Sequence, residues 1–360
     1  MSGNKICLII PSLKVGGMER VMSELANYLA GQNTEVWLVL MFRDEIFYTL
    51  DPRIQLVRPS IKKRFNATYA FYLFPFLRRR IKAIDADAVL SFGERYNSYV
   101  LIATLGLKTP VYISDRSSPH KRLSKFNLKL SKLLYRRAAG IIAQTSKAAE
   151  LLSARLDGAQ SNIRVIHNPL RKIELAPYQK KNQIIALGRL VREKRYDRLL
   201  KIMALLQNKS WKLVIVGEGR FRELIEKQIE EYGLQDRVVL AGQQRDVDSF
   251  LGESRIYVLT SDIEGFPNAL CEAMAHGLAC IAYDCVAGPS DIIRDGENGI
   301  LVEEGDAQRY ARELDLLIED ADKREHLGSE AVKIRDSLHV DTIFEEYRQF
   351  IFSTSKKVLR

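Results

Sequence analysis

Two carboxylates in the stretch EGFPNALCE (264–272) are the first residues whose types and spacing could do chemistry. Glu264 and Glu272 stand eight positions apart. The preceding run RIYVLTSD (255–262) predicts a buried strand, and Pro267 suits the first turn of a helix. Glu264 then lies in a loop and Glu272 on a helix. The two acids therefore indicate two separate ligand contacts rather than one shared proton.

The start of this helix, around residues 267–269, offers backbone N–H groups that could hold an anion. A carboxylate near a helix start also stabilises the helix through its dipole, so Glu272 has a purely structural alternative.

A pair of cations forms the second candidate group. Arg189 and Lys194 follow the predicted strand IIALGRL (184–190), and ligands of open α/β sheets bind at the carboxyl ends of strands. Two cations at such an end suit a diphosphate. The alternative is a solvated basic loop, which we expect for the neighbouring Arg192 and Arg195.

Gly16 and Gly17 lie in PSLKVGGMERV (11–21), where a strand turns into a helix. Glycine allows close approach of a ligand to the backbone, although a tight turn alone would explain the pair. The stretch lacks the full GxGxxG pattern, which argues against a nicotinamide-dependent dehydrogenase.

The elements that must position these residues alternate between short apolar runs and helical stretches. This pattern predicts an α/β protein with two Rossmann-like domains in tandem. We expect an N-terminal domain over 1–168, a linker over 169–183, a second domain over 184–335, and a last helix within 336–360 that returns to the N-terminal domain.

Composition and charge narrow the class of protein. Four cysteines without a CxxC pair, Cys7, Cys271, Cys280 and Cys285, predict buried reduced thiols.

Residues 1–168 hold 26 Lys and Arg against 12 Asp and Glu, whereas the remainder is slightly acidic. The first half should therefore meet an anionic partner. A nucleic-acid-binding protein is an alternative of another class, but the chain shows no recognised nucleic-acid module.

Several motifs in order along the chain resemble the family 4 glycosyltransferases of the GT-B fold. The motifs are GGMER, HNP, GRLVREK, VGEGRFRELIE, SDIEGFPNALCEAMAHGLACIAYD and GPSDIIRDGENGILV. The resemblance implies two Rossmann-like domains, an acceptor-binding domain over 1–168 and a nucleotide-sugar-binding domain over 184–335. It also implies transfer of a sugar from a nucleotide-sugar donor with retention of configuration. It implies no cofactor and no metal ion.

The resemblance also implies roles for single residues. Arg189 and Lys194 match the pair that binds the donor diphosphate and stabilises its charge as the glycosidic bond breaks. Glu264 matches the acid that lies against the donor sugar, and these three are the candidate catalytic residues. Glu272 matches the acid that binds the ribose hydroxyls, and the loop 242–247 matches the base-binding region. Further donor contacts are implied for Gly16, Gly17, Gly265, Phe266, Pro267, Asn268 and Ala269.

One position departs from the family pattern. Where many relatives carry a functional His after the strand VYISD (111–115), this chain has Arg116, with His120 four residues later. Asp115 and Arg116 are the candidates for contact with the sugar or acceptor. Two Asp-x-Asp triplets, Asp85–Asp87 and Asp320–Asp322, are attributed to chance rather than to metal binding.

Basic and aromatic residues are interleaved in the segments 61–82 and 120–137, which predicts an amphipathic surface for a bilayer interface. A solvated helix with core aromatics is the alternative. We expect a cytoplasmic enzyme, peripheral on the inner face of the cytoplasmic membrane and acting on a polyprenyl-diphosphate-linked or other lipid-linked glycan acceptor. A UDP-sugar, such as a UDP-N-acetylhexosamine or UDP-hexose, is the favoured donor, and a GDP-mannose-dependent mannosyltransferase is the alternative.

Overall fold

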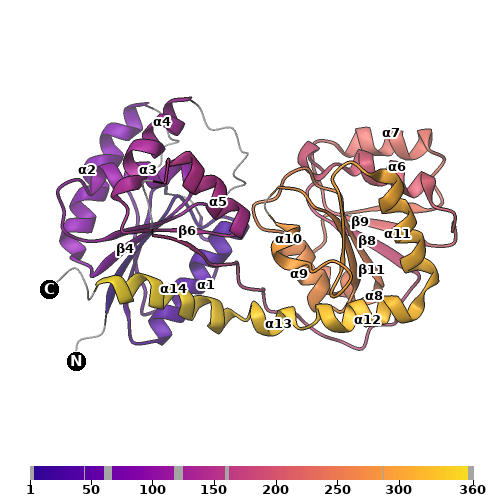
Figure 1. Cartoon of the computed structure of the whole chain (residues 1–360). Helices are drawn as coiled ribbons and strands as arrows, with labels where there is room; N and C mark the ends of the chain where they lie inside the picture. Colours follow the sequence, from indigo (N-terminus) through magenta and orange to yellow (C-terminus); the bar gives the residue numbers. More distant parts are fainter. Residues whose placement is uncertain are drawn as a thin grey trace. The chain divides into compact units, whose positions relative to one another are not determined.

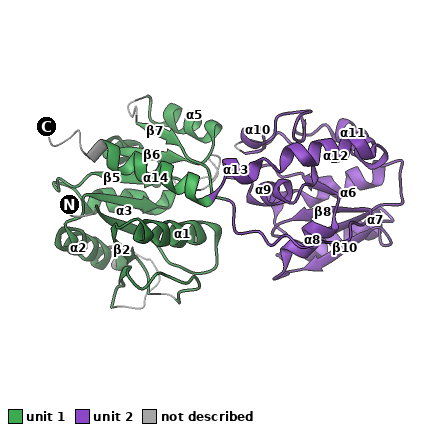
Figure 2. Cartoon of the chain, turned by 90° about the horizontal axis from the view of Figure 1, so that it is seen from below, with its two compact units in different colours: residues 1–169, 340–360 green, residues 170–339 purple. Residues whose placement is uncertain are grey.

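The computed structural model describes residues 4–43, 45–60, 67–116, 125–158, 162–286 and 288–355 (Figure 1). The chain divides into two units, residues 1–169 with 340–360 and residues 170–339 (Figure 2). Each unit is built on its own parallel sheet covered by helices, which confirms the predicted α/β class with two Rossmann-like domains.

Unit 1 contains a seven-stranded sheet in the order β3-β2-β1-β4-β5-β6-β7. Its central strands are buried apolar runs, as expected for a sheet covered on both faces, whereas the edge strands β3 and β7 are partly exposed. Their bounds are β1 Lys5–Ile10, β2 Glu35–Leu40, β3 Gln55–Val57, β4 Ala88–Phe92, β5 Val111–Ser114, β6 Gly140–Ala143 and β7 Ile163–Val165.

The helices of unit 1 separate into two layers. Residues of α2 to α5 join one face of the sheet in a single apolar cluster, while α1 and α14 pack on each other and on the other face. The bounds are α1 Gly17–Gly31, α2 Ala67–Ile84, α3 Glu94–Ala103, α4 Lys125–Leu134, the 3₁₀ turn η1 Tyr135–Arg137, α5 Ser146–Arg155 and α14 Val340–Ser355.

Unit 2 contains a six-stranded sheet in the order β10-β9-β8-β11-β12-β13. Its strands are β8 Gln183–Leu187, β9 Lys212–Val216, β10 Val238–Gly242, β11 Ile256–Leu259, β12 Ala279–Tyr283 and β13 Ile300–Val302. Pairing is parallel throughout, with Gln183 opposite Lys212 and Ile184 opposite Ile256.

The helices of unit 2 also lie on both faces. One apolar cluster joins α6, α7, α11 and α12 to the sheet, whereas α8 and α9 contact β8, β11 and β12. The bounds are η2 Arg192–Lys194 (a 3₁₀ turn), α6 Tyr196–Leu205, α7 Arg222–Glu231, α8 Val247–Glu253, α9 Asn268–Ala275, α10 Pro289–Ile292, α11 Ala307–Glu319, α12 Ala321–Ala331 and α13 Ile334–Ser337.

Both sheets reverse their strand order at one point, between β1 and β4 in unit 1 and between β8 and β11 in unit 2. In open α/β sheets, ligands bind beside the carboxyl ends of the strands at such a reversal. In unit 2 the reversal is flanked by the loop after β8, which carries Arg189 and Lys194, and by the loop after β11, which carries Glu264.

The last helix, α14, follows unit 2 in the chain but packs in unit 1 (Figure 1). The Tyr28 and Phe344 rings lie 5.6 Å apart, and the Tyr28 hydroxyl donates to Glu345 over 3.2 Å. Apolar side chains of α14, among them Phe344 and Ile351, are fully buried. The helix is therefore part of the unit 1 core.

Three further sequence features have a definite structural place. All four cysteines are free and buried, as predicted. Asp87 accepts a hydrogen bond from the Lys5 backbone, and Asp320 caps α12 by accepting from the Lys323 backbone. No cluster of three or more metal-ligating side chains occurs within the described residues.

In the part of the chain that the structure describes, no helix combines the length and the apolar character needed to cross a bilayer.

Candidate functional site

The loops after β8 and β11 bring Lys194 and Glu264 together. Lys194 Nζ lies 2.7 Å from Glu264 Oε1, and the two side chains are 21% and 10% exposed. Lys194 ends the 3₁₀ turn η2, which directs its side chain toward the loop after β11. The pair thus places a cation and an anion side by side at the strand reversal of unit 2.

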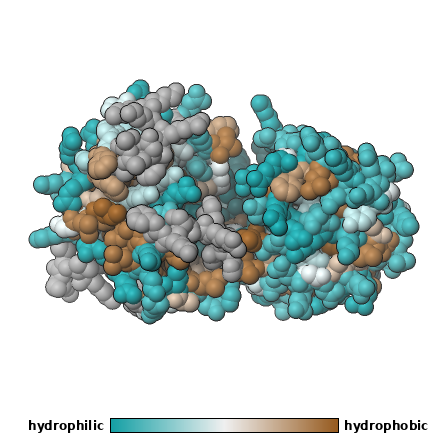
Figure 3. Space-filling model, turned by 90° about the horizontal axis from the view of Figure 1, so that it is seen from above, coloured by the Kyte–Doolittle hydropathy of each residue, from teal (hydrophilic) through white to brown (hydrophobic). Residues whose placement is uncertain are grey.

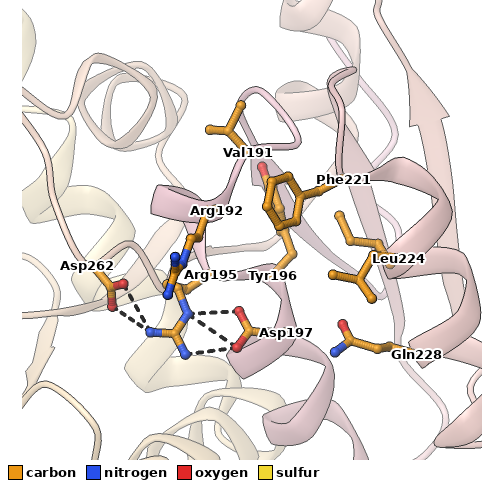
Figure 4. Close-up of a pocket in the computed structure, with 10 residues that line it drawn as sticks. Val191, Arg192, Arg195, Tyr196, Asp197, Phe221, Leu224, Gln228 and Asp262 are labelled. Carbon is orange, nitrogen blue, oxygen red and sulfur yellow. Dashed lines mark hydrogen bonds and ion pairs between the residues drawn. The ribbon is translucent and has the colours of Figure 1, made fainter.

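Arg195 fixes the turn that carries Lys194. Its backbone is left-handed, with φ of 51°. Its guanidinium bonds to Asp197 over 2.8 to 3.2 Å and to Asp262 over 3.0 Å, as the dashed lines in Figure 4 show. The Thr260 hydroxyl donates to the carbonyls of Lys194 and Arg195. These contacts attach the turn to the segment that precedes Glu264.

The expectation that Arg195 is a solvated member of a basic loop is therefore wrong. It is 26% exposed and forms ion pairs with two carboxylates. Arg192, three positions earlier, is exposed as expected. The sequence could not separate the two, because the acid that distinguishes them, Asp262, lies far away in the chain.

Figure 4 also shows a pocket behind this turn, between η2 and α7. It has a volume of about 290 Å³, with Val191, Tyr196, Phe221 and Leu224 among the residues that line it. Burial, and then the charge of Glu264, raise the pKa of the Tyr196 hydroxyl.

Arg189 is the other cation predicted at this edge. Its guanidinium is exposed and has no ion-pair partner in the described part of the chain. The loop's backbone is held by β9, because Gly188 donates its N–H to the Val216 carbonyl over 3.0 Å. Gly217 (φ 147°) packs so closely on the Gly188 carbonyl that a Cβ would collide with it. The VGEG motif therefore has a packing role as well.

The segment from Glu264 to α9 is compact. Glu264 and Phe266 are 8% and 7% exposed, and Gly288 lies so close that an added Cβ would be 3.2 Å from both Glu264 Cβ and Pro267 Cδ. Burial raises the pKa of the nearby Cys285 thiol to about 12, and the charge of Glu264 adds to that shift. Glu264 is therefore largely shielded from solvent.

The helix start differs in detail from the expectation. Pro267 is the N-cap of α9 rather than a first-turn residue, and it has no N–H. The Asn268 N–H donates to the Phe266 carbonyl over 2.9 Å. Of residues 267–269, only Ala269 keeps an N–H available to an anion. The prediction that backbone N–H groups of all three residues could bind an anion is therefore wrong at two positions. Gly265, between Glu264 and Phe266, is partly exposed.

Glu272 lies on α9 and pairs with Arg171. Arg171 Nε is 3.1 Å from Glu272 Oε2, while its other two nitrogens bond to Asp248 over 2.9 and 2.6 Å. Asp248 belongs to α8, immediately after the loop 242–247. Neither Arg171 nor Asp248 was predicted from the sequence. The only signal was the position of Arg171 in HNPLR (167–171), two residues after the HNP motif.

In unit 1, Gly16 and Gly17 begin α1 as predicted. Tyr48 holds this turn, because its hydroxyl accepts from the Gly16 N–H over 3.0 Å and donates to the Gly16 carbonyl over 2.8 Å. Gly17 remains exposed. The backbone of Gly16 is thus already hydrogen-bonded within unit 1.

Asp115 belongs to a buried polar network at the end of β5. It pairs with Arg155 at 2.9 Å and accepts from the Tyr135 hydroxyl at 2.8 Å and from Asn97 at 3.0 Å. Glu94 also pairs with Arg155, at 3.3 Å. The network joins the carboxyl ends of β4 and β5.

Arg116 faces a different set of groups. Its guanidinium donates to the Tyr347 hydroxyl over 2.8 Å and to Asn168, and it lies 4.6 Å from the centre of the Phe92 ring. Burial lowers the pKa of this guanidinium. Arg116 therefore attaches α14 and the HNP segment to the sheet of unit 1. His120 lies outside the described residues.

Comparison with known proteins identifies the family. Residues 15–171 match the family model "Glycosyltransferase Family 4", and residues 169–334 match "Glycosyl transferases group 1". Together the two models account for both units. The chain belongs to the GT-B glycosyltransferases.

A curated relative of this glycosyltransferase is an α-1,4-N-acetyl-D-galactosaminyltransferase of Campylobacter jejuni, whose name includes a glycan linked to undecaprenol through a diphosphate. It is 27% identical over 96% of this chain and 98% of its own. Among solved structures, the apo lipopolysaccharide outer core galactosyltransferase WaaB has a TM-score of 0.81 at 23% identity, covering 97% and 99%. Anabaena HepE in complex with UDP and glucose has a TM-score of 0.74 at 19% identity, covering 96% and 98%. These structures share the fold of the chain.

Proposed function

We propose that this glycosyltransferase moves a sugar, with retention of configuration, from a UDP-sugar to a lipid-linked glycan acceptor in bacterial polysaccharide or glycan biosynthesis. The contact between Lys194 and Glu264 carries the proposal, because it places opposite charges at the strand reversal of unit 2, where ligands of such sheets bind. The named sugars of the relatives, N-acetylgalactosamine and galactose, support an N-acetylhexosamine or hexose donor.

The cations act on the leaving group in this proposal. As the bond between the sugar C1 and the diphosphate oxygen breaks, negative charge grows on the diphosphate, and Lys194 and Arg189 stabilise it. The exposed guanidinium of Arg189 is available to a ligand, while Lys194 is held in place by the Arg195 contacts. The acceptor hydroxyl forms the new bond to C1, and its proton passes to the departing diphosphate.

The two carboxylates have separate tasks. Glu264, shielded and beside Lys194, lies against the donor sugar, and Glu272 on α9 binds the ribose hydroxyls. Backbone groups of Gly265 and Ala269 complete the donor contacts in unit 2 under this proposal. A contact of the donor with Gly16 and Gly17 stays a prediction from the sequence. Asp115 and Arg116 are proposed on the acceptor side, where the buried network and α14 fix their positions. No metal ion or cofactor is part of this scheme.

A donor screen tests this function. The protein is incubated with UDP-N-acetylglucosamine, UDP-N-acetylgalactosamine, UDP-glucose, UDP-galactose and GDP-mannose, and the thermal midpoint and release of the nucleotide diphosphate are measured. We expect at least one UDP-sugar to raise the midpoint and to be cleaved. If only GDP-mannose raises the midpoint and is cleaved, the donor is GDP-mannose and not a UDP-sugar. If none of the five nucleotide-sugars has either effect, the proposed function is wrong.

We further propose that unit 1 associates with the cytoplasmic face of an anionic membrane. Arg58 and two residues of α2, Arg79 and Arg80, line a groove of about 570 Å³ together with Phe71, which is 82% exposed. None of the described residues that line this groove is acidic. On the face of unit 1 in Figure 3, hydrophobic and hydrophilic residues are interleaved. Such a surface suits an interface with lipid headgroups.

Liposome flotation tests the membrane proposal. Wild-type protein should float with vesicles that contain about one third phosphatidylglycerol and remain in the dense fraction with neutral vesicles. Replacement of Arg79 and Arg80 by Glu should abolish flotation without changing the response to UDP-sugars. Wild-type protein that stays in the dense fraction with anionic vesicles contradicts the proposal.

A further inference from the structure

Arg171 connects two acidic residues on different helices of unit 2. Its Nη1 and Nη2 atoms bond to the two carboxylate oxygens of Asp248 over 2.9 and 2.6 Å, while Nε lies 3.1 Å from Glu272 Oε2. Nη1 also donates to the Lys172 carbonyl over 3.1 Å. The planar guanidinium therefore uses all three nitrogens and has a fixed orientation.

The three side chains are shielded from water. Arg171, Asp248 and Glu272 are 24%, 10% and 17% exposed. Burial opposes the charge on Arg171, but its bonds to Asp248 and Glu272 prevail and raise its pKa. Interactions between charges are stronger in such a partly desolvated site, where the effective dielectric constant is lower, than on an open surface. The contact is thus more than a solvated surface ion pair.

Helix α9, which carries Glu272, is also anchored at its C-terminal end. His276 Nδ1 bonds to the Glu272 carbonyl over 2.9 Å, and His276 Nε2 lies 3.1 Å from Asp248 Oδ1. Arg335 donates to the Ala275 carbonyl. With the backbone of α9 fixed in this way, the orientation of the Glu272 carboxylate depends on Arg171.

We infer that Arg171 is a positioning residue that aims the Glu272 carboxylate at the ribose hydroxyls of the donor nucleotide. This inference rests on the proposed function of Glu272. Arg171 engages Oε2, and Oε1 has no hydrogen-bond partner among the residues that the structure describes. A carboxylate with one oxygen held rigidly presents the other as an oriented acceptor. Such a site discriminates against a sugar that lacks the hydroxyl it was built to bind.

The test compares UDP with 2′-deoxy-UDP, and GDP with 2′-deoxy-GDP, by titration calorimetry on the full chain. Wild-type protein should prefer the ribonucleotide by about tenfold or more, as expected for one well-oriented hydrogen bond. Arg171→Gln should reduce this preference to about twofold. With a reactive UDP-sugar, the same variant should raise the donor KM by about tenfold and leave kcat within about threefold.

Further variants make the result specific. If Arg171→Gln is too unstable to purify, Asp248→Asn removes the anchor of Arg171 and should lower the ribose preference in the same direction. Lys333→Gln breaks an exposed ion pair in unit 2, with Glu330, and should behave as wild type. In a Glu272→Gln background, Arg171→Gln should weaken UDP binding by less than about twofold, because its target is already lost.

The outcomes separate the inference from the proposed function. If wild-type protein binds the ribonucleotides and Arg171→Gln keeps the full preference for them, the positioning role is wrong while the function stands. Independent, multiplicative effects of Arg171→Gln and Glu272→Gln would also overturn it. If wild-type protein binds none of the nucleotides, the proposed function fails and the inference fails with it.

Discussion

Lys194 Nζ and Glu264 Oε1 lie 2.7 Å apart, although 70 positions separate the residues in the chain. The contact joins the loop after β8 to the loop after β11, the two strands between which the sheet of unit 2 reverses its order. A shielded cation with a fixed position can stabilise charge that develops on a leaving group without first reorganising solvent.

The first prediction concerns turnover. Lys194→Ala and Glu264→Ala should each lower kcat/KM for the reactive nucleotide-sugar by about 10²- to 10³-fold, because each removes a charge from the site of bond breaking. Arg192→Ala, which changes an exposed cation two residues from Lys194, should cost less than about threefold. Equal and mild effects in all three variants would remove the basis for the assignment.

The second prediction concerns the support of Lys194. Arg195→Ala leaves Asp197 without its cation and removes one of two cations from Asp262, which keeps Arg198 at 2.8 Å, and we expect a loss of about 1 kcal/mol in the free energy of unfolding. Turnover should fall as well, because the turn that carries Lys194 loses an attachment. Urea unfolding and kcat/KM measure the two effects, with Arg192→Ala as the control. An Arg195→Ala protein with normal turnover would show that the turn is rigid without these ion pairs.

The third prediction concerns the core of unit 2. The Tyr310 hydroxyl donates to the Ile281 carbonyl over 2.8 Å and accepts from the Leu259 N–H over 3.2 Å, so it bridges β12 and β11. Tyr310→Phe should cost about 1 to 2 kcal/mol of unfolding free energy.

Tyr257 offers a matched control in the same core. Its hydroxyl is buried and has no hydrogen-bond partner among the described residues. Tyr257→Phe should therefore be neutral or slightly stabilising in the same urea measurement. Equal losses in the two variants would show that the Tyr310 hydrogen bonds contribute nothing.

The fourth prediction concerns acid stability. Burial lowers the pKa of His276, with Arg171 and Lys180 acting in the same direction, while the bond to the Glu272 carbonyl and the charge of Asp248 oppose the shift. The folded state therefore binds its proton less readily than the unfolded state. Stability from this neutral His is complete above its ordinary pKa of about 6.5 and is lost as the pH falls toward the folded value.

A stability profile measures this effect. Between pH 7 and pH 5, unfolding free energy of the wild type should fall with a slope to which His276 contributes at most about 1.4 kcal/mol per pH unit. His276→Gln should flatten the profile in that range. His326→Gln, at an exposed position of α12, should leave the profile unchanged. Identical slopes for His276→Gln and wild type would contradict the shift.

The sequence predicted the fold well because apolar runs and helical stretches each report on local structure. The strand around 255–262 and the helix after Pro267 appear as expected, and the strand order then brings the loops after β8 and β11 together. The parallel sheet explains why motifs far apart in the chain, such as those of Lys194 and Glu264, meet at one edge.

The supporting residues were not predictable in the same way. Arg195 pairs with Asp262, 67 positions away, and Arg171 pairs with Asp248, 77 positions away. No local pattern indicates which of these distant acids a given arginine will meet. The N–H groups at the start of α9 were also misjudged. The absence of an N–H at Pro267 follows from the residue type and should have been recognised, whereas the turn that engages the Asn268 N–H with the Phe266 carbonyl could not be predicted from the helix pattern.

Calorimetric titration with UDP tests the central claim most directly, because binding requires the site but not the correct sugar or acceptor. We expect UDP to bind wild-type protein and Arg192→Ala alike, and we expect Lys194→Ala to weaken this binding by about tenfold or more. UDP that binds Lys194→Ala as tightly as wild type, or that binds neither protein, would contradict the claim that the edge of unit 2 around Lys194 and Glu264 holds the donor.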